Sequence, residues 1–66
     1  MELQPHQQRV VDEMNELKQK ADRLESFIVG DTFLTLEKID QGLLIAQFDV
    51  MGAYLRILGL RVLRFG

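Results

Sequence analysis

The stretch LIAQFDVMGAYLRILGLRVLRF, residues 44–65, decides the fold. Its apolar residues recur at alternating steps of three and four, which is typical of a helix that packs along another helix. Counting back from Phe65 in steps of four and three predicts a contact stripe of Arg61, Leu58, Tyr54, Met51, Gln47 and Leu44. An arginine is unexpected there, because a guanidinium keeps its charge and is costly to bury without an anionic partner.

A second apolar stripe runs beside the first. It consists of Leu43, Ala46, Val50, Ala53, Ile57 and Leu60. A helix that is apolar on most of its circumference is buried on several sides. A chain of 66 residues has little material for that burial, and without cysteine it has no disulfides to compensate. We therefore expect other copies of the chain to cover this helix, with Gly52 and Gly59 allowing a close approach.

A first helix is expected to begin near Pro5 and to end at Gly30, its C′ residue. Its apolar positions repeat in heptads and are Val10, Met14, Leu17, Ala21, Leu24 and Ile28. Asp31 and Thr32 are expected to cap a short turn. The apolar residues of that turn, which are expected to plug the open end of a helical hairpin, are Phe33, Leu34 and Leu36.

The second long helix is expected to start between Glu37 and Asp40 and to run toward Phe65. These patterns predict an all-α fold in which residues 1–66 form a single domain for oligomerisation and ligand binding. The expected architecture is a helical hairpin of two long helices joined by a short helical turn, which assembles into a compact oligomer.

Charge is unevenly distributed along the chain, whose formal net charge is −2. Residues 1–49 carry a net −5, and residues 50–66 carry only the three arginines Arg56, Arg61 and Arg64. An acidic chain is a poor non-specific DNA binder, because that affinity comes from many phosphate contacts. We therefore expect no DNA partner, and a small discrete anion fits a few arginines better.

The apolar segment from Leu43 to Leu60 is interrupted by Gln47, Asp49 and Arg56. This interruption favours a buried helix of an oligomer over a membrane span. The first nine residues are mostly polar and no apolar signal segment follows them, so the cytoplasm is the expected compartment.

No catalytic arrangement is predicted. Ser26 and His6 lie about 30 Å apart along one helix, far beyond hydrogen-bonding reach. The sequence contains neither a glycine-rich phosphate loop nor metal-ligand spacing. We expect a protein that is not an enzyme and that has no cofactor and no metal.

The residues alone leave the role of Arg61 open. It can pair with an acid of another subunit, such as Glu16 or Asp49, or it can line an anion pocket where subunits meet. Arginines near a helix C-terminus, such as Arg56 and Arg64, are also favoured by the helix dipole. Spacing of four residues offers Glu16 as a partner for Lys20 and Glu13 as a partner for Arg9, and His6 is also consistent with a frayed terminal residue.

Two groups of residues carry a resemblance to a known family. The first is Pro5-His6-Gln7-Gln8-Arg9-Val10-Val11-Asp12-Glu13, followed by Glu16-Leu17, Lys20, Leu24 and Phe27-Ile28. The second is the spacing Gln47, Met51, Tyr54, Leu58 and Arg61. Together they cover almost the whole chain. It resembles a family of very small phage proteins that includes the anti-CBASS cyclic-oligonucleotide sponges.

The resemblance implies an all-helical compact hexamer in the cytoplasm of the infected bacterial host. It implies binding of cyclic dinucleotides and cyclic trinucleotides, the messengers of CBASS immunity, at separate subunit interfaces and without cleavage. Sequestration of the messengers then prevents activation of the CBASS effector.

The resemblance also assigns site residues. His6 stands where the family has a larger aromatic residue, and with Arg9 and Lys20 it is expected to bind a cyclic dinucleotide. Arg61 matches an arginine in the C-terminal helix of the family, and we expect it to bind a cyclic trinucleotide together with Arg56. A symmetric oligomer can place three copies of Arg61 around a threefold axis. The alternatives are a structural or adaptor oligomer that binds a protein partner, and a nucleic-acid-binding module.

Overall fold

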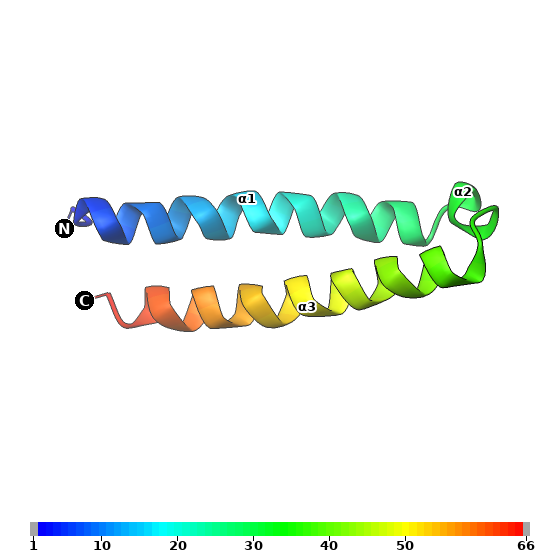
Figure 1. Cartoon of the computed structure of the whole chain (residues 1–66). Helices are drawn as coiled ribbons and strands as arrows, with labels where there is room; N and C mark the ends of the chain where they lie inside the picture. Colours follow the sequence, from blue (N-terminus) through cyan, green and yellow to red (C-terminus); the bar gives the residue numbers. More distant parts are fainter. Residues whose placement is uncertain (1, 66) are drawn as a thin grey trace.

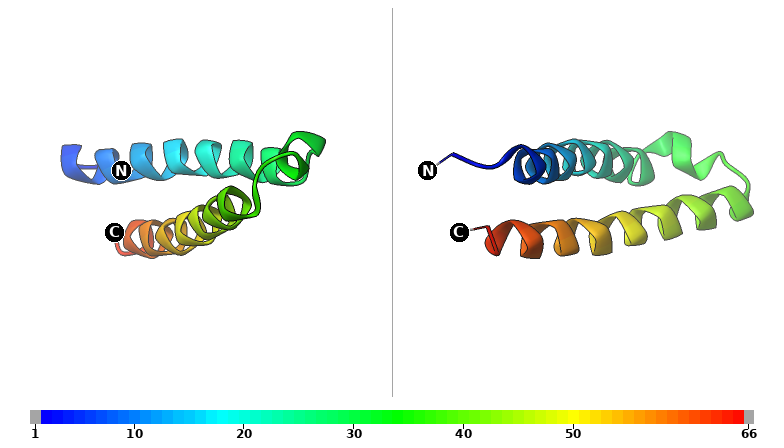
Figure 2. Two further views of the ribbon diagram at one scale, coloured as in Figure 1. Left: turned by 45° about the vertical axis from the view of Figure 1, so that its right-hand side comes forward. Right: turned by 60° about the vertical axis from the view of Figure 1, so that its left-hand side comes forward.

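The chain is an antiparallel hairpin of two long helices. The structure, a computed structural model, describes residues 2–65. Its helices are α1 (Pro5–Ile28), α2 (Asp31–Leu34) and α3 (Lys38–Leu63). α1 and α3 lie side by side, α2 closes one end, and both termini lie at the other end (Figure 1). Two further views show the same pairing (Figure 2), and the hairpin measures 48 × 15 × 14 Å. The predicted all-α hairpin with a short helical turn is confirmed.

Local sequence explains the bounds of α1. Pro5 is the first helical residue, where its missing N–H is not needed. The backbone N–H of Gln4 donates to Oε1 of Gln7 at 2.9 Å, which satisfies one donor at the helix start. At the other end, the N–H of Gly30 donates to the carbonyl oxygen of Phe27. The predictions for Pro5 and Gly30 are confirmed.

Apolar packing closes the turn. Phe33 is buried, and its ring meets the ring of Phe27 edge-on, with centroids 6.4 Å apart. Leu36 is half-buried, and its carbonyl oxygen accepts a 2.9 Å hydrogen bond from Nε2 of the buried Gln41. Leu34 is 72% exposed, so the predicted plug is right for Phe33 and Leu36 and wrong for Leu34.

The predicted capping of α2 is wrong. Gly30 is its N-cap residue, and Asp31 is already its first helical residue. The hydroxyl of Thr35 donates to the carbonyl oxygen of Thr32 at 2.6 Å. A backbone carbonyl near the end of α2 is thereby satisfied by a side chain. α3 begins at Lys38, with Glu37 as its N-cap residue, as predicted.

The packed face of α1 is the predicted heptad stripe. Val10 and Ala21 are buried, and the other four residues of the stripe are half-buried. The facing stripe of α3 has Leu58, 0% exposed, near its C-terminal end. Its buried or half-buried members are Gln41, Leu44, Phe48, Met51, Leu55, Leu58 and Val62, and Phe65 continues the stripe just beyond the end of the helix.

This observed stripe corrects the predicted one. The two share Leu44, Met51, Leu58 and Phe65, but Phe48, Leu55 and Val62 replace Gln47, Tyr54 and Arg61. Both patterns alternate steps of three and four, so spacing alone does not separate them. Burial of Phe, Leu and Val removes more apolar surface from water, and it leaves the guanidinium of Arg61 hydrated. Arg61 therefore lies beside the contact, not within it.

α3 is also long and apolar enough to span a membrane, by length and composition only. Almost none of this apolar segment is buried within the hairpin. The hairpin thus leaves most of α3 accessible to whatever surrounds it.

Candidate functional site

One long edge of the hairpin gathers most of the residues that the sequence singles out. We call it the polar edge. It consists of His6, Glu13, Lys20 and Phe27 on α1 and Asp40, Gln47, Tyr54 and Arg61 on α3, all exposed. Within each set the residues are seven apart, so they follow one line of the helix with a drift of about 20° per heptad. Each directly precedes a buried or half-buried residue.

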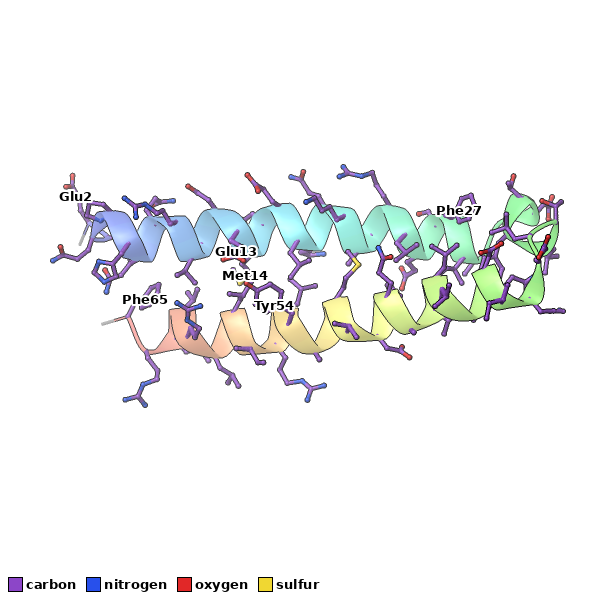
Figure 3. The ribbon with its side chains drawn as sticks, in the orientation of Figure 1. Glu2, Glu13, Met14, Phe27, Tyr54 and Phe65 are labelled. Atoms are coloured by element: carbon purple, nitrogen blue, oxygen red, sulfur yellow. The ribbon has the colours of Figure 1, made fainter. Side chains whose placement is uncertain are left out.

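A hydrogen bond between the helices shows which positions of this edge are level with each other. The hydroxyl of Tyr54 donates to Oε2 of Glu13, and both side chains lie between the helices (Figure 3). Because α1 and α3 are antiparallel, a heptad forward on one matches a heptad back on the other. His6 is therefore level with Arg61, Lys20 with Gln47, and Phe27 with Asp40. Successive levels are about 10.5 Å apart.

The edge combines flat rings with cations. Phe27 and Tyr54 are 38% and 39% exposed, whereas Phe33, Phe48 and Phe65 are buried or half-buried. The imidazole of His6 adds a third ring. Among residues 2–65 the exposed aromatic rings thus all lie on the polar edge, together with the cations Lys20 and Arg61. Such rings can stack on bases, and such cations can bind phosphate.

The electrostatics of the edge centre on Tyr54. Its pKa is raised above the ordinary value mainly by the hydrogen bond to Glu13, with smaller contributions from desolvation and the charge of Glu13. The charge of Arg61 acts in the opposite direction and lowers the pKa. Tyr54 therefore stays a neutral hydrogen-bond donor at neutral pH, and Arg61 lies close enough to act on it.

The expected ion pairs of α1 are not those that form. Within residues 2–65 the ion pair joins Lys18 and Asp22, at 3.1 Å. Neither Lys20 nor Arg61 forms an ion pair with an acid in this range. Glu13, the possible partner of Arg9, instead accepts the hydrogen bond from Tyr54. The cations of the polar edge are therefore available to an external anion.

A single chain does not assemble the predicted pockets. His6 and Lys20 share the edge but lie about 21 Å apart along α1, and Arg9 lies on the outer margin of the same edge. Arg56 and Arg61 are five residues apart, which places them roughly 140° apart around α3. A compact ligand that contacts either predicted set must therefore draw its residues from more than one copy.

Sequence reasoning did not identify Glu13 and Phe27 as candidate site residues. The signal was the heptad itself, because residues 6, 13, 20 and 27 are spaced by seven. The sequence alone does not show that these residues face Tyr54 and Arg61. The pairing of Glu13 with Tyr54 depends on the register between the helices, which the packed face of α3 defines.

The opposite edge of the hairpin is small and open. On α3 it contains Gly52 and Gly59, and a Cβ built at either position meets no atom within 4 Å.

The outer surface of α3 is the second predicted stripe, and it is exposed throughout. The exposed fractions of its larger members are 62% for Leu43, 68% for Val50, 54% for Ile57 and 57% for Leu60. Among the described residues, no group of three or more His, Asp or Glu side chains is placed to hold a metal ion.

Comparison with known proteins gives a family. The family model described as Sequestin matches residues 4–64. An uncharacterized 7.5 kDa protein in the denB-rIIB intergenic region of Enterobacteria phage T4 is 35% identical over 60 residues, which cover 91% of this chain and 94% of the relative. No solved structure matches the chain. Since the match spans nearly every residue of the hairpin, the chain belongs to the Sequestin family.

Proposed function

We propose that this protein binds cyclic dinucleotides and cyclic trinucleotides and sequesters them without cleavage, which prevents activation of CBASS effectors. Its family indicates a small phage protein that sequesters something inside the infected host. The observation that carries the proposal is the polar edge, where exposed rings and unpaired cations alternate along the hairpin.

The chemistry of the edge fits the proposed ligands. A cyclic oligonucleotide presents several phosphates and as many flat bases in a small ring. Arg61 can bind a phosphate by a fork of two hydrogen bonds, and Lys20 can act as a point charge. Phe27, Tyr54 and His6 offer surfaces for base stacking, which is worth about 1–3 kcal/mol per base.

Complete pockets require an oligomer in this proposal. The hairpin exposes 5315 Å², whereas a compact monomer of 7.6 kDa exposes about 4,300 Å². The excess, roughly 1,000 Å², is comparable with the roughly 800 Å² that each partner buries in a standard interface. The exposed stripe of α3 supplies apolar surface for such contacts, and a hexamer is the proposed state.

Gly52 and Gly59 support this oligomer independently. Each glycine lowers helix propensity by about 1 kcal/mol relative to alanine. Nothing within the hairpin requires glycine at either position, because a Cβ built there would meet no atom within 4 Å. A close approach by a helix of another copy would explain why these positions lack a Cβ.

Sequestration is proposed in place of turnover. The polar edge supplies rings, cations and two carboxylates, Asp40 and Glu13, of which Glu13 is already hydrogen-bonded to Tyr54. Among residues 2–65, the single serine, Ser26, and the single histidine, His6, lie far apart on α1. These groups suit binding and charge neutralisation better than bond cleavage.

A second candidate function is that of an adaptor oligomer that binds a host or phage protein. The exposed stripe of α3 favours it, because contiguous apolar surface often marks a protein interface. The two functions differ in what the polar edge must do: sequestration needs its cations, whereas an adaptor needs only the stripe.

Calorimetry with a panel of cyclic di- and trinucleotides tests the proposal. Binding that is lost on replacement of Lys20 or Arg61, with the oligomer intact, is the expected result. An intact oligomer that binds none of the panel would support the adaptor function.

A further inference from the structure

A tethered carboxylate lies between the two cationic positions of the polar edge. Glu13 is one heptad from Lys20 along α1, and its partner Tyr54 is one heptad from Arg61 along α3. From the termini toward the turn, the order of charge along the edge is therefore Arg61, Glu13, Lys20, Asp40: positive, negative, positive, negative. The spacing is about 10.5 Å between levels.

Glu13 is held at this position. An exposed glutamate ordinarily samples many rotamers, but its Oε2 accepts the hydroxyl of Tyr54 from the other helix. The Tyr54 side chain has only two rotatable bonds and projects from the flank of a packed heptad. The carboxylate therefore stays at the centre of the edge, where an incoming anion would meet it.

We propose that Glu13 is a specificity-determining residue: a fixed counter-anion that keeps small anions off the polar edge. This inference rests on the proposed function and deepens it. A small anion near Arg61 or Lys20 gains the attraction of one cation and meets the repulsion of Glu13. A cyclic oligonucleotide also gains base stacking and the attraction of further cations from neighbouring copies, and these gains exceed the repulsion by Glu13. Glu13 thus reserves the edge for ligands that carry bases.

Inorganic pyrophosphate is the probe for this inference. Glu13→Gln removes the charge and keeps an oxygen that can accept from Tyr54. Glu25→Gln is the matched control, since it removes one charge from an exposed position on the same helix but off the polar edge. We expect Glu13→Gln to bind pyrophosphate about three- to tenfold more tightly than wild type, as for a nearby unit charge in a partly solvated site. Glu25→Gln should match wild type.

Calorimetry with full-length wild-type and variant proteins gives the affinities, and circular dichroism confirms that all three are helical. Equal affinities for Glu13→Gln and Glu25→Gln, including no binding by either, would overturn the inference. The cyclic nucleotide panel on the same proteins judges the proposed function separately. If wild type binds no cyclic nucleotide while Glu13→Gln gains affinity for pyrophosphate, the proposed function fails and the charge role of Glu13 stands.

Discussion

Tyr54 on α3 donates a hydrogen bond to the carboxylate of Glu13 on α1, and this contact shows which positions of the two helices are level on the polar edge. It places Arg61 level with His6 and Lys20 level with Gln47. The hydrogen bond raises the pKa of Tyr54, and the charge of Arg61 partly offsets the increase. The pKa of Tyr54 therefore depends on both Glu13 and Arg61.

The titration of Tyr54 tests this arrangement. Glu13→Ala should lower the pKa of Tyr54 toward the ordinary value of about 10, because it removes the hydrogen bond and the negative charge. Arg61→Ala should raise the pKa of Tyr54 further. Since Tyr54 is the only tyrosine, ultraviolet absorbance of its phenolate follows the titration directly. An unchanged midpoint in both variants would show that these groups do not meet in solution.

Alkaline pH should weaken the hairpin. A pKa raised by folding means that the neutral phenol is favoured in the folded state. This stabilisation is complete below the unfolded pKa of about 10 and is lost as pH rises through the folded pKa. Urea unfolding at a series of pH values measures it. Tyr54→Phe should not lose stability over this window, and equal loss in wild type and Tyr54→Phe would contradict the prediction.

The corrected stripe of α3 predicts which residues stabilise the hairpin. Leu58→Ala should lower the free energy of unfolding by about 2–5 kcal/mol, because it leaves a cavity at a fully buried position. Arg61→Ala, at an exposed position, should change it by less than about 0.5 kcal/mol. Thermal unfolding measures both. A large loss for Arg61→Ala would restore the stripe that the sequence first predicted.

The glycines of α3 should act on assembly and not on the hairpin. Gly52→Ala and Gly59→Ala should each increase helix propensity by about 1 kcal/mol. The added methyl group should not clash within the hairpin, because the space around both positions is open. If another copy packs against them, the added methyl groups should weaken the oligomer. Gly42→Ala, which is equally open, is a control outside that pair. Analytical ultracentrifugation that shows the same oligomer in every variant would argue against this contact.

The two cations of the edge should differ in their ligands. Arg61→Ala should weaken cyclic trinucleotide binding by about tenfold or more, the loss of a charge-assisted hydrogen bond, and Lys20→Ala should weaken cyclic dinucleotide binding similarly. Lys18→Ala, on the opposite edge and paired with Asp22, is the matched control for Lys20→Ala. Calorimetry measures both affinities. Equal losses of cyclic dinucleotide affinity in Lys18→Ala and Lys20→Ala would show that Lys20 is not part of the binding site.

Heptad spacing predicted the hairpin well and the packed face of α3 only in part. For α1, polar residues surround a single apolar stripe, so the packed face was unambiguous. α3 is apolar on most sides, so two stripes one residue apart fit the same alternation of steps. The energetic difference between burying Val62 and burying Arg61, not the spacing, decides between them.

The candidate site was predictable as residues but not as an arrangement. Lys20, His6 and Arg61 could be named from the sequence, yet their common edge depends on the register between α1 and α3. A contact between positions 13 and 54, which are far apart in the chain, shows that register. No local pattern encodes such a pair.

Native mass spectrometry with a mixture of cyclic di- and trinucleotides tests the central claim most directly. The account predicts an oligomer that retains a fixed number of ligands per assembly, with the ligands recovered intact after denaturation. Arg61→Ala should retain the oligomer and lose the cyclic trinucleotide. An oligomer whose mass no cyclic nucleotide shifts, or ligands recovered as cleaved products, would contradict sequestration as the function of this protein.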